Sequence, residues 1–365
     1  MTEDLPWRAR LNPALSHLSI YDVPPSRAPA RMHANESPEQ WSPAAMRAVA
    51  SAVADVELNR YPDTSGRDLR AILGERHQVD PTRIVLGNGS DEIISLLLTA
   101  LLHPGADPHL VIPTPTFVMY AHSAHVLGFK VTEVPLTPAF QLDMEAMRHA
   151  LTNASICFLA RPNNPTSSLW DADEIRSLVQ EFPRTIFVID EAYGAYAPGA
   201  SLYDPNGPSN QVHMTTLSKV GLAALRLGYC VAHPVLATAL NKCRHPYNIS
   251  ATTLAIAETL LRDHSGELDD HLARNLARRD QLIEVLRGVP DAEVFPAHAN
   301  LVLCRLTPAS RAPSLAATLA EGGVRVKDVS GTPGLEGCLR ISLGSEGELR
   351  ALAAVLQTVT PSSAP

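Results

Sequence analysis

The sequence predicts an α/β fold, in which a mostly parallel sheet with helices on both faces is joined to a smaller α+β lobe. Short apolar runs alternate with helical periodicity over the first two thirds of the chain. Such runs are typical of strands that are buried on both faces of a parallel sheet. Beyond Ile249 the pattern changes to long amphipathic helices, notably over 266–288. With 365 residues and 45% hydrophobic content, the chain is long enough to form two such lobes.

The elements begin after an irregular start that contains several prolines. We expect an N-terminal arm over 1–30, a large domain over 31–250 and a small C-terminal domain over 251–365. Ser42 is suited to cap a helix whose first turn holds Pro43. Buried strands are predicted at 83–86, 109–112, 155–160, 185–189, 213–215 and 227–232, helices at 90–102 and 171–180, and small-domain strands at 300–306 and 338–343.

Charge and cysteine content narrow the classes of function. The formal charge is −8 and the sequence has no long run of Lys or Arg, so nothing favours nucleic acid or an anionic membrane as a partner. No apolar stretch is long enough to span a bilayer, and residues 1–10 lack the apolar core of a secretory signal. The 5 cysteines are scattered through apolar segments, which indicates reduced core residues. We therefore expect a cytoplasmic protein with small-molecule ligands and no metal site.

The most informative segment is 215–226, because it places Lys219 among hydroxyl groups and near a second cation. A lysine amine becomes a nucleophile toward an aldehyde when burial and neighbouring positive charge favour its neutral form. Thr216, Ser218 and Arg226 are suited to hold a phosphate dianion nearby. The combination predicts a phosphate-bearing, imine-forming cofactor, pyridoxal 5′-phosphate. Taken alone, the segment is also compatible with a lysine on a surface loop.

Two upstream motifs lie after predicted strands. Residues 87–92 read Gly-Asn-Gly-Ser-Asp-Glu and lead into a predicted helix, whose first amides favour a bound phosphate. The alternative is an ordinary turn capped by Ser90 or Asp91. Phe117, in the second motif over 113–117, is suited to stack on a pyridine ring, and the alternative is a core aromatic.

Residues 161–166 and 188–193 each follow a predicted strand, at the edge where open α/β sheets place ligands. A carboxylate such as Asp190 at the end of a buried strand is costly unless it meets a cation, and a protonated pyridine nitrogen is such a cation. That pairing keeps the cofactor an electron sink. Asn164 and Tyr193 are suited to donate hydrogen bonds to the phenolate oxygen of the cofactor. Their alternatives are a proline turn and a packed aromatic.

Together these motifs resemble the fold-type I pyridoxal-phosphate-dependent aminotransferases of classes I and II, with the histidinol-phosphate aminotransferase family as the best match. The resemblance runs from about Tyr21 to Leu343. It implies a fold-type I architecture with Lys219 as the Schiff-base lysine. It also implies that Asp190 contacts the pyridine nitrogen, that Asn164 and Tyr193 contact the phenolate oxygen, and that Phe117 stacks on the ring. It also implies that the cofactor phosphate is bound by Ser90, Asp91, Thr216, Ser218 and Arg226, and by Tyr61 of the neighbouring subunit in a homodimer.

The same resemblance implies the substrate-binding residues. Arg340, within 339–344, matches the arginine that binds a substrate carboxylate or phosphate, and its alternative is a strand-edge salt bridge. Lys327 stands where many members carry an arginine for the substrate phosphate, and a lysine keeps the charge but loses the bidentate geometry. Tyr21 matches a tyrosine near that phosphate. Asn35 belongs to an early strand-end motif of the family.

Two further positions depart from the family pattern. Ser167 follows the Asn-Pro-Thr turn, where many members carry glycine. Seven positions separate Lys219 from Arg226, where many relatives have eight. We expect Arg226 to reach the phosphate site even though its spacing from Lys219 is shorter than in those relatives.

The implied reaction is transfer of the amino group of L-histidinol phosphate to 2-oxoglutarate, a step of histidine biosynthesis that gives imidazole-acetol phosphate and glutamate. Aromatic aminotransferases, and decarboxylases of phosphorylated amino acids, share nearly all of the cofactor-binding residues, so both stay open as alternatives. A pyridoxal-phosphate-binding protein without catalysis and an unrelated doubly wound sheet protein are two more. The complete set of acid, base and phosphate-binding residues disfavours a protein without catalysis.

Overall fold

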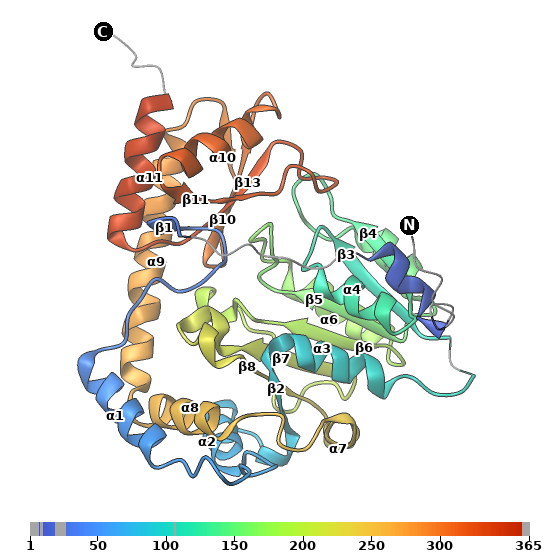
Figure 1. The fold of residues 1–365 in the computed structure, drawn as a ribbon. Helices are drawn as coiled ribbons and strands as arrows, with labels where there is room; N and C mark the ends of the chain where they lie inside the picture. The colour runs from blue at the N-terminus through green and yellow to red at the C-terminus, as the bar shows by residue number, and fades with distance from the viewer. Residues whose placement is uncertain (1–6, 8–9, 19–26, 106, 360–365) are drawn as a thin grey trace.

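A seven-stranded sheet forms the centre of the larger lobe in the computed structural model, which describes residues 7, 10–18, 27–105 and 107–359 (Figure 1). The strand order is β2-β8-β7-β6-β5-β3-β4. The strands are β2 (Ile84–Asn88), β3 (His109–Thr114), β4 (Lys130–Pro135), β5 (Ile156–Ala160), β6 (Ile186–Asp190), β7 (Gln211–Thr216) and β8 (Leu227–Val231). Pairs from β7 to β4 are parallel, and β8 is antiparallel to both neighbours. The predicted mostly parallel sheet is therefore confirmed.

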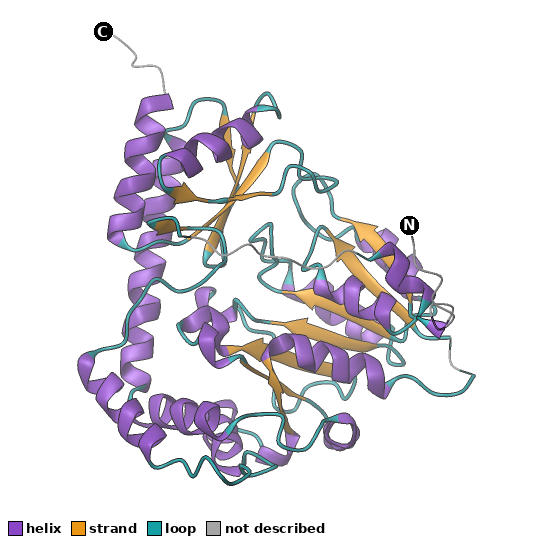
Figure 2. Cartoon of the chain, in the orientation of Figure 1, coloured by secondary structure: helices purple, strands orange, loops and turns teal. Residues whose placement is uncertain are grey.

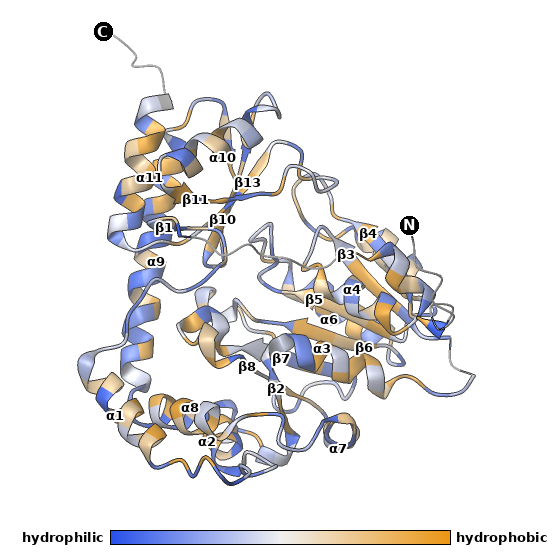
Figure 3. Ribbon diagram, viewed as in Figure 1, coloured by the Kyte–Doolittle hydropathy of each residue, from blue (hydrophilic) through white to orange (hydrophobic). Residues whose placement is uncertain are grey.

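Helices cover both faces of this sheet (Figure 2). One face packs against α3 (Gly89–Ala100), α4 (Met119–Val126) and α7 (Pro234–Cys243), and the other against α5 (Met144–Leu151) and α6 (Ala172–Glu181). Every residue of β5 is buried, with Ile156 and Phe158 in the first core and Cys157 and Leu159 in the second. This alternation follows from the two-residue period of a strand. Figure 3 shows β3, β5 and β6 as mainly hydrophobic.

A third group of helices packs beside β2 and β8, formed by α1 (Pro43–Ala54), α2 (Arg67–His77) and α8 (Ala251–Asp263). Helix α1 begins as predicted, because the Ser42 side chain accepts a hydrogen bond from the amide of Ala45 and Pro43 occupies the first turn. Helix α8 lies beyond residue 250 and still contacts α1 and α2. The domain limits near 30 and 250 stay predictions.

The smaller lobe follows the 23-residue helix α9 (Ser265–Arg287). Its antiparallel sheet has the order β12-β13-β10-β9 and is accompanied by α10 (Arg311–Glu321) and α11 (Glu346–Val359). The strands are β9 (Ala292–Val294), β10 (Leu301–Leu306), β12 (Lys327–Asp328) and β13 (Cys338–Ser342). A separate pair joins β1 (Ala30–Arg31) to β11 (Val324–Arg325) in parallel. The segment after β1 therefore starts from the smaller lobe and crosses to the larger one (Figure 1).

Short 3-10 turns complete the described elements: η2 (Pro13–His17), η3 (Pro81–Arg83), η4 (Gly194–Tyr196), η5 (Leu217–Val220) and η6 (Ala223–Leu225). The turns η5 and η6 connect β7 to β8, and η4 follows β6. Over the described part of the chain, none of the helices combines the length and the apolar character that a bilayer crossing requires.

Candidate active site

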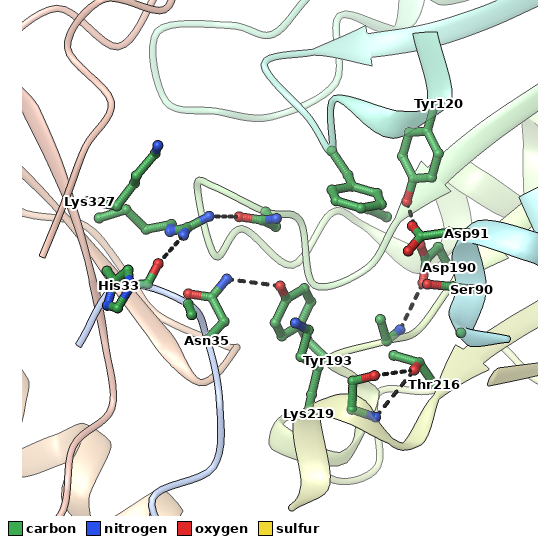
Figure 4. Close-up of a pocket in the computed structure, with 18 of the residues that line it drawn as sticks. His33, Asn35, Ser90, Asp91, Tyr120, Asp190, Tyr193, Thr216, Lys219 and Lys327 are labelled. Carbon is green, nitrogen blue, oxygen red and sulfur yellow. Dashed lines mark hydrogen bonds between the residues drawn. The ribbon is translucent and has the colours of Figure 1, made fainter. Parts of the chain in front are cut away.

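A cavity of about 490 Å³ lies between the ends of strands β5, β6 and β7 and the smaller lobe. Its position follows from the sheet, since parallel strands end at one common edge. Register pairs Ala160 with Asp190, and both line the cavity. All the predicted site residues except Tyr21 and Tyr61 line it as well. Figure 4 shows Lys219, Tyr193 and Asn35 between Asp190 on one side and Lys327 on the other.

The first turn of α3 forms one end of the cavity through Gly89, Ser90 and Asp91. Gly89 has a φ of 72°, and a Cβ added there would lie 2.9 Å from Nη2 of Arg226. A Cβ on Gly228 of β8 would lie 2.5 Å from the carbonyl carbon of Gly89, so only glycine allows the strand to approach this turn. Asn88 forms no side-chain cap hydrogen bond. The open helix start is the geometry that favours a bound phosphate.

Hydroxyls and a guanidinium from 216–226 face the same turn. Oγ1 of Thr216 lies 2.9 Å from Oγ of Ser218, and Nη1 of Arg226 lies 3.5 Å from that Ser218 oxygen. Nη2 of Arg226 forms an ion pair with Oδ2 of Asp91 at 3.1 Å, which orients the guanidinium. Arg226 adopts the left-handed conformation, with a φ of 49°. The left-handed turn after η6 thus brings Arg226 to the cavity despite the shortened spacing from Lys219.

Asp190 ends β6, is 4% exposed and forms no ion pair among the residues that the structure describes. Its Oδ2 accepts a hydrogen bond from the Tyr120 hydroxyl at 2.5 Å, and its Oδ1 accepts one from the amide of Ala192 at 2.9 Å. Burial raises the pKa of Asp190 to about 6, while both hydrogen bonds act in the opposite direction. A buried carboxylate with these neighbours is suited to a cationic partner in the cavity.

Tyr120 is a site residue that the sequence analysis missed. It is fully buried, stacks on Phe158 with ring centroids 4.7 Å apart, and contacts Phe117 edge to face. Burial, followed by the charge of Asp190, raises the pKa of the Tyr120 hydroxyl, so the phenol remains a donor. Helical periodicity gave no signal that links Tyr120 to Phe117, because Phe117 precedes helix α4, which begins at Met119.

Lys219 and Tyr193 occupy the middle of the cavity. Nζ of Lys219 lies 5.7 Å from the centroid of the Tyr193 ring, and the Tyr193 hydroxyl accepts a hydrogen bond from Nδ2 of Asn35 at 2.9 Å. Asn35 is 2% exposed, and it exchanges hydrogen bonds with the Ser342 hydroxyl of β13 while its carbonyl accepts one from Asn300. Asn35 therefore ties Tyr193 to the sheet of the smaller lobe. The sequence analysis missed both Ser342 and Asn300.

Cations from the smaller lobe form the other end of the cavity. Nη1 of Arg340 donates to Oδ1 of Asn164 at 2.8 Å, and Nη2 donates to the carbonyl of His33 at 2.5 Å. Lys327 lies opposite Arg340 in the register of β12 and β13. Three further lining residues here were not singled out from the sequence: His33, Arg325 and Asp328.

Ser167 adopts a φ of 59°, the left-handed region that favours glycine. Its side chain is fully buried, and its hydroxyl accepts hydrogen bonds from the amides of His298 and Ala299, each at 2.9 Å. These two hydrogen bonds offset the cost of the conformation and attach the Asn164 loop to the segment that leads into β10.

Tyr61 lies outside this cavity. Its side chain is 80% exposed and stacks on Tyr247, with ring centroids 4.4 Å apart. Leu58 beside it in the sequence is 86% exposed. Tyr21 falls outside the described residues. The roles predicted for both tyrosines stay predictions.

Two features at the larger-lobe end of the cavity fit the chemistry of pyridoxal 5′-phosphate. An acid without a cationic partner within the described chain, Asp190, matches a protonated ring nitrogen. The start of α3 with Arg226 and Ser218 matches a phosphate, and Lys219 lines the same cavity (Figure 4). This donor set suits the cofactor better than a neutral ligand, which would leave Asp190 uncompensated.

Comparisons with known proteins agree with this geometry. The family described as aminotransferase class I and II matches residues 30–356. Histidinol-phosphate aminotransferase 2 of Nitrosococcus oceani is 35% identical over 351 residues, which cover 95% of this chain and 96% of that protein. Histidinol-phosphate aminotransferase 2 of Cupriavidus pinatubonensis is 38% identical and covers 93% of this chain and 94% of its own. The crystal structure of histidinol-phosphate aminotransferase from Sinorhizobium meliloti in complex with pyridoxal-5′-phosphate superimposes with a TM-score of 0.86 at 25% identity, over 96% of this chain and 99% of that one.

Proposed function

Because the chain belongs to the histidinol-phosphate aminotransferase family within the class I and II aminotransferases, we propose that it transfers the amino group of L-histidinol phosphate to 2-oxoglutarate. The products are imidazole-acetol phosphate and glutamate, and the cofactor is pyridoxal 5′-phosphate. When bound, this cofactor supplies an aldehyde that reacts with amines and a ring that withdraws electrons from the reacting carbon.

Residues of the larger lobe would hold the cofactor. Asp190 is placed to hold the proton on the ring nitrogen, and Tyr120 and the amide of Ala192 fix the direction of its carboxylate. The phosphate would lie at the start of α3, between Ser90, Thr216, Ser218 and Arg226, with Asp91 orienting the guanidinium. Phe117 lines the cavity beside Tyr120 and is suited to stack on the ring. Asn164 and Tyr193 are polar neighbours for the phenolate oxygen.

Lys219 is the proposed base. Its Nζ lies near the centre of the cavity, and its backbone carbonyl accepts a hydrogen bond of 2.6 Å from the Tyr196 hydroxyl, which fixes the turn η5. With the cofactor and a donor bound, the freed Lys219 amine would remove the proton from the donor carbon and would deliver it to the aldehyde-derived carbon of the cofactor. Turnover therefore needs Lys219 for every donor.

Residues of the smaller lobe would select the donor. Arg340 and Lys327 place positive charge opposite Lys219, as a donor with a distal anion requires. One observation carries the proposal. The same cavity contains the buried acid Asp190 and Lys219 on the larger lobe, and the cations Lys327 and Arg340 on the sheet that faces them. An unphosphorylated aromatic amino acid offers these cations a carboxylate with a single negative charge, whereas a phosphate monoester carries between about 1.5 and 2 negative charges at pH 7.

We also propose a homodimer, in which Tyr61 completes the site of the neighbouring copy. An aromatic and apolar surface formed by Leu58, Tyr61 and Tyr247 is exposed, with values of 86%, 80% and 41%. Side chains of this kind are typical of interface centres. A cytoplasmic location and the domain limits at 30 and 250 likewise remain proposals.

The experiment that tests the proposal compares amino donors by kcat/KM, with 2-oxoglutarate as acceptor. L-Histidinol phosphate should exceed phenylalanine, and phosphothreonine should give no loss of carbon dioxide. A strong preference for phenylalanine would favour an aromatic aminotransferase instead. Borohydride reduction followed by mass spectrometry should place the cofactor on Lys219. A colourless protein without that adduct would contradict the assignment.

A further inference from the structure

A cation that no sequence motif indicated, Arg325, lines the same end of the cavity as Lys327 and Arg340. Arg325 alternates with Val324 and Val326, which are 0% and 9% exposed and belong to the core of the smaller lobe. Arg325 and Lys327 both line the cavity, as does Val326 between them. The carbonyl of Arg325 accepts a hydrogen bond from the amide of Met32 at 2.9 Å, so its backbone is fixed.

This end of the cavity carries more positive than negative charge. Lys327 and Arg340 are directly opposed on neighbouring strands, an arrangement that is unfavourable for like charges. Within the described residues, neither Arg325 nor Lys327 forms an ion pair. Asp328 also lines this end, but its Oδ1 accepts a hydrogen bond from the amide of Ser330 at 2.9 Å. An anionic ligand would remove the repulsion among the three cations.

His33 adds an unpartnered polar atom to the same place. Its Nδ1 is buried and has no hydrogen-bond partner in the described structure. Burial lowers the pKa of His33, and the next largest cause is the positive charge of Arg325. His33 and Arg325 line the same cavity. A buried ring nitrogen without a partner is costly, and a ligand oxygen or hydroxyl would satisfy it.

Resting on the proposed function, we infer that Arg325 binds the phosphate monoester of the amino donor and supplies the bidentate contact that Lys327 cannot. A guanidinium presents two parallel N–H groups to a phosphate, whereas an ammonium acts as a point charge. In this chain the fork stands two residues before Lys327. Arg325 is thus a specificity residue for phosphorylated donors, with Lys327 as the second charge.

The test uses the cofactor-loaded enzyme with Arg325→Gln and Arg325→Lys. Arg31→Gln is the matched control, since Arg31 pairs with Arg325 in register but is exposed and does not line the cavity. Arg325→Gln should raise KM for L-histidinol phosphate by about 10- to 100-fold. KM for L-histidinol, which lacks the phosphate, should change less than about twofold. Arg325→Lys should fall between these results, and Arg31→Gln should match the unaltered enzyme.

Two outcomes would overturn the inference: equal losses for both donors in Arg325→Gln, which indicate a structural role, or an unchanged KM for the phosphorylated donor. If the unaltered enzyme does not convert L-histidinol phosphate, the proposed function fails and inorganic phosphate becomes the probe. Competitive inhibition by phosphate of the reaction with glutamate, lost in Arg325→Gln and kept in Arg31→Gln, would still support the phosphate site. Equal inhibition of both variants would refute it.

Discussion

The two ends of the cavity differ in how their charges are balanced. At the end formed by the larger lobe, Arg226 is paired with Asp91 and the Asp190 carboxylate is held by Tyr120 and a backbone amide. At the end formed by the smaller lobe, Arg325 and Lys327 face the cavity without ion pairs among the described residues. The first end is therefore organised before any ligand binds, while the second leaves its charge for the ligand to neutralise.

The difference separates two kinds of function. Groups that are fixed in advance act on every substrate that reaches them, because their positions do not depend on the substrate. Cations without partners discriminate between ligands by charge. Changes at the larger lobe should therefore affect all donors equally, and changes at the smaller lobe should affect donors according to their anionic groups.

Lys219→Ala should have the largest effect, because it removes the proposed nucleophile and base together. Turnover of every donor should fall by at least about 1000-fold. The cofactor should still bind without a covalent link, as equilibrium dialysis and the visible spectrum would report. Lys130→Ala, on strand β4 and away from the cavity, is the control. Full activity in Lys219→Ala would contradict the proposed role.

Asp190→Asn should have the next largest effect, a loss in kcat of about 100- to 1000-fold for all donors, because the ring nitrogen loses its negative partner. The relative ranking of donors should not change. Steady-state kinetics with two donors measures both expectations. A loss in kcat for only one donor would contradict the proposal that the larger-lobe end acts equally on all donors.

The same variant has a pH-dependent effect on the cofactor-free protein. The pKa of Asp190 rises from 3.8 to about 6 on folding, so its contribution to stability is complete below 3.8 and is lost as the pH rises through 6. The difference corresponds to about 3 kcal/mol. Asp190→Asn should therefore stabilise the cofactor-free protein at pH 8 and have little effect at pH 4 in urea denaturation. Equal stabilisation at both pH values would contradict this account.

Arg340→Gln should affect binding more than chemistry. We expect KM for anionic donors to rise by about 10- to 100-fold, because the guanidinium contributes charge-assisted hydrogen bonds. The cofactor spectrum and cofactor affinity should stay unchanged. Arg305→Gln is the control, since Arg305 belongs to the same sheet but pairs with Glu293 outside the cavity. Loss of cofactor affinity in Arg340→Gln would show that the two ends are not separable.

Tyr120→Phe should have the smallest effect. The ring keeps its stacking on Phe158, and only the hydrogen bond to Asp190 is lost. Because that bond lowers the pKa of Asp190, its removal should raise this pKa. The pH at which ionisation of Asp190 lowers the stability of the cofactor-free protein should therefore move upward. Stability at pH 8 should fall by about 1 kcal/mol. Urea denaturation across pH measures the shift, and an unchanged transition would exclude the coupling.

The larger lobe and its part of the site were predictable because two signals coincide there. Continuous apolar runs identify the buried strands, and polar residues at their ends, such as Asp190 and Asn164, mark the edge that binds ligands. Strand β4 escaped prediction because its residues are mostly exposed or half-buried and its sequence is mixed. The site of the smaller lobe was less visible. Strands β11 and β12 have two residues each, too few to show any periodicity, so Arg325 could not be placed.

Contacts between distant parts of the sequence also limited the prediction. Tyr120 was missed because its partner Asp190 lies 70 positions away, and a pattern in one helix does not indicate that partner. For Ser167, the sequence showed the departure from the expected glycine. It did not show that the amides of His298 and Ala299 donate the hydrogen bonds that compensate for this departure.

The pairing of β1 with β11 has a consequence for biosynthesis. Ala30 and Arg31 emerge from the ribosome long before their partners Val324 and Arg325 have been made. A nascent chain that has reached Arg226 holds every larger-lobe residue of the cavity, and yet His33 and Asn35 have no strand to lie against. The donor-binding end of the cavity therefore forms only after Arg340 has been made, however well the preceding larger lobe has folded.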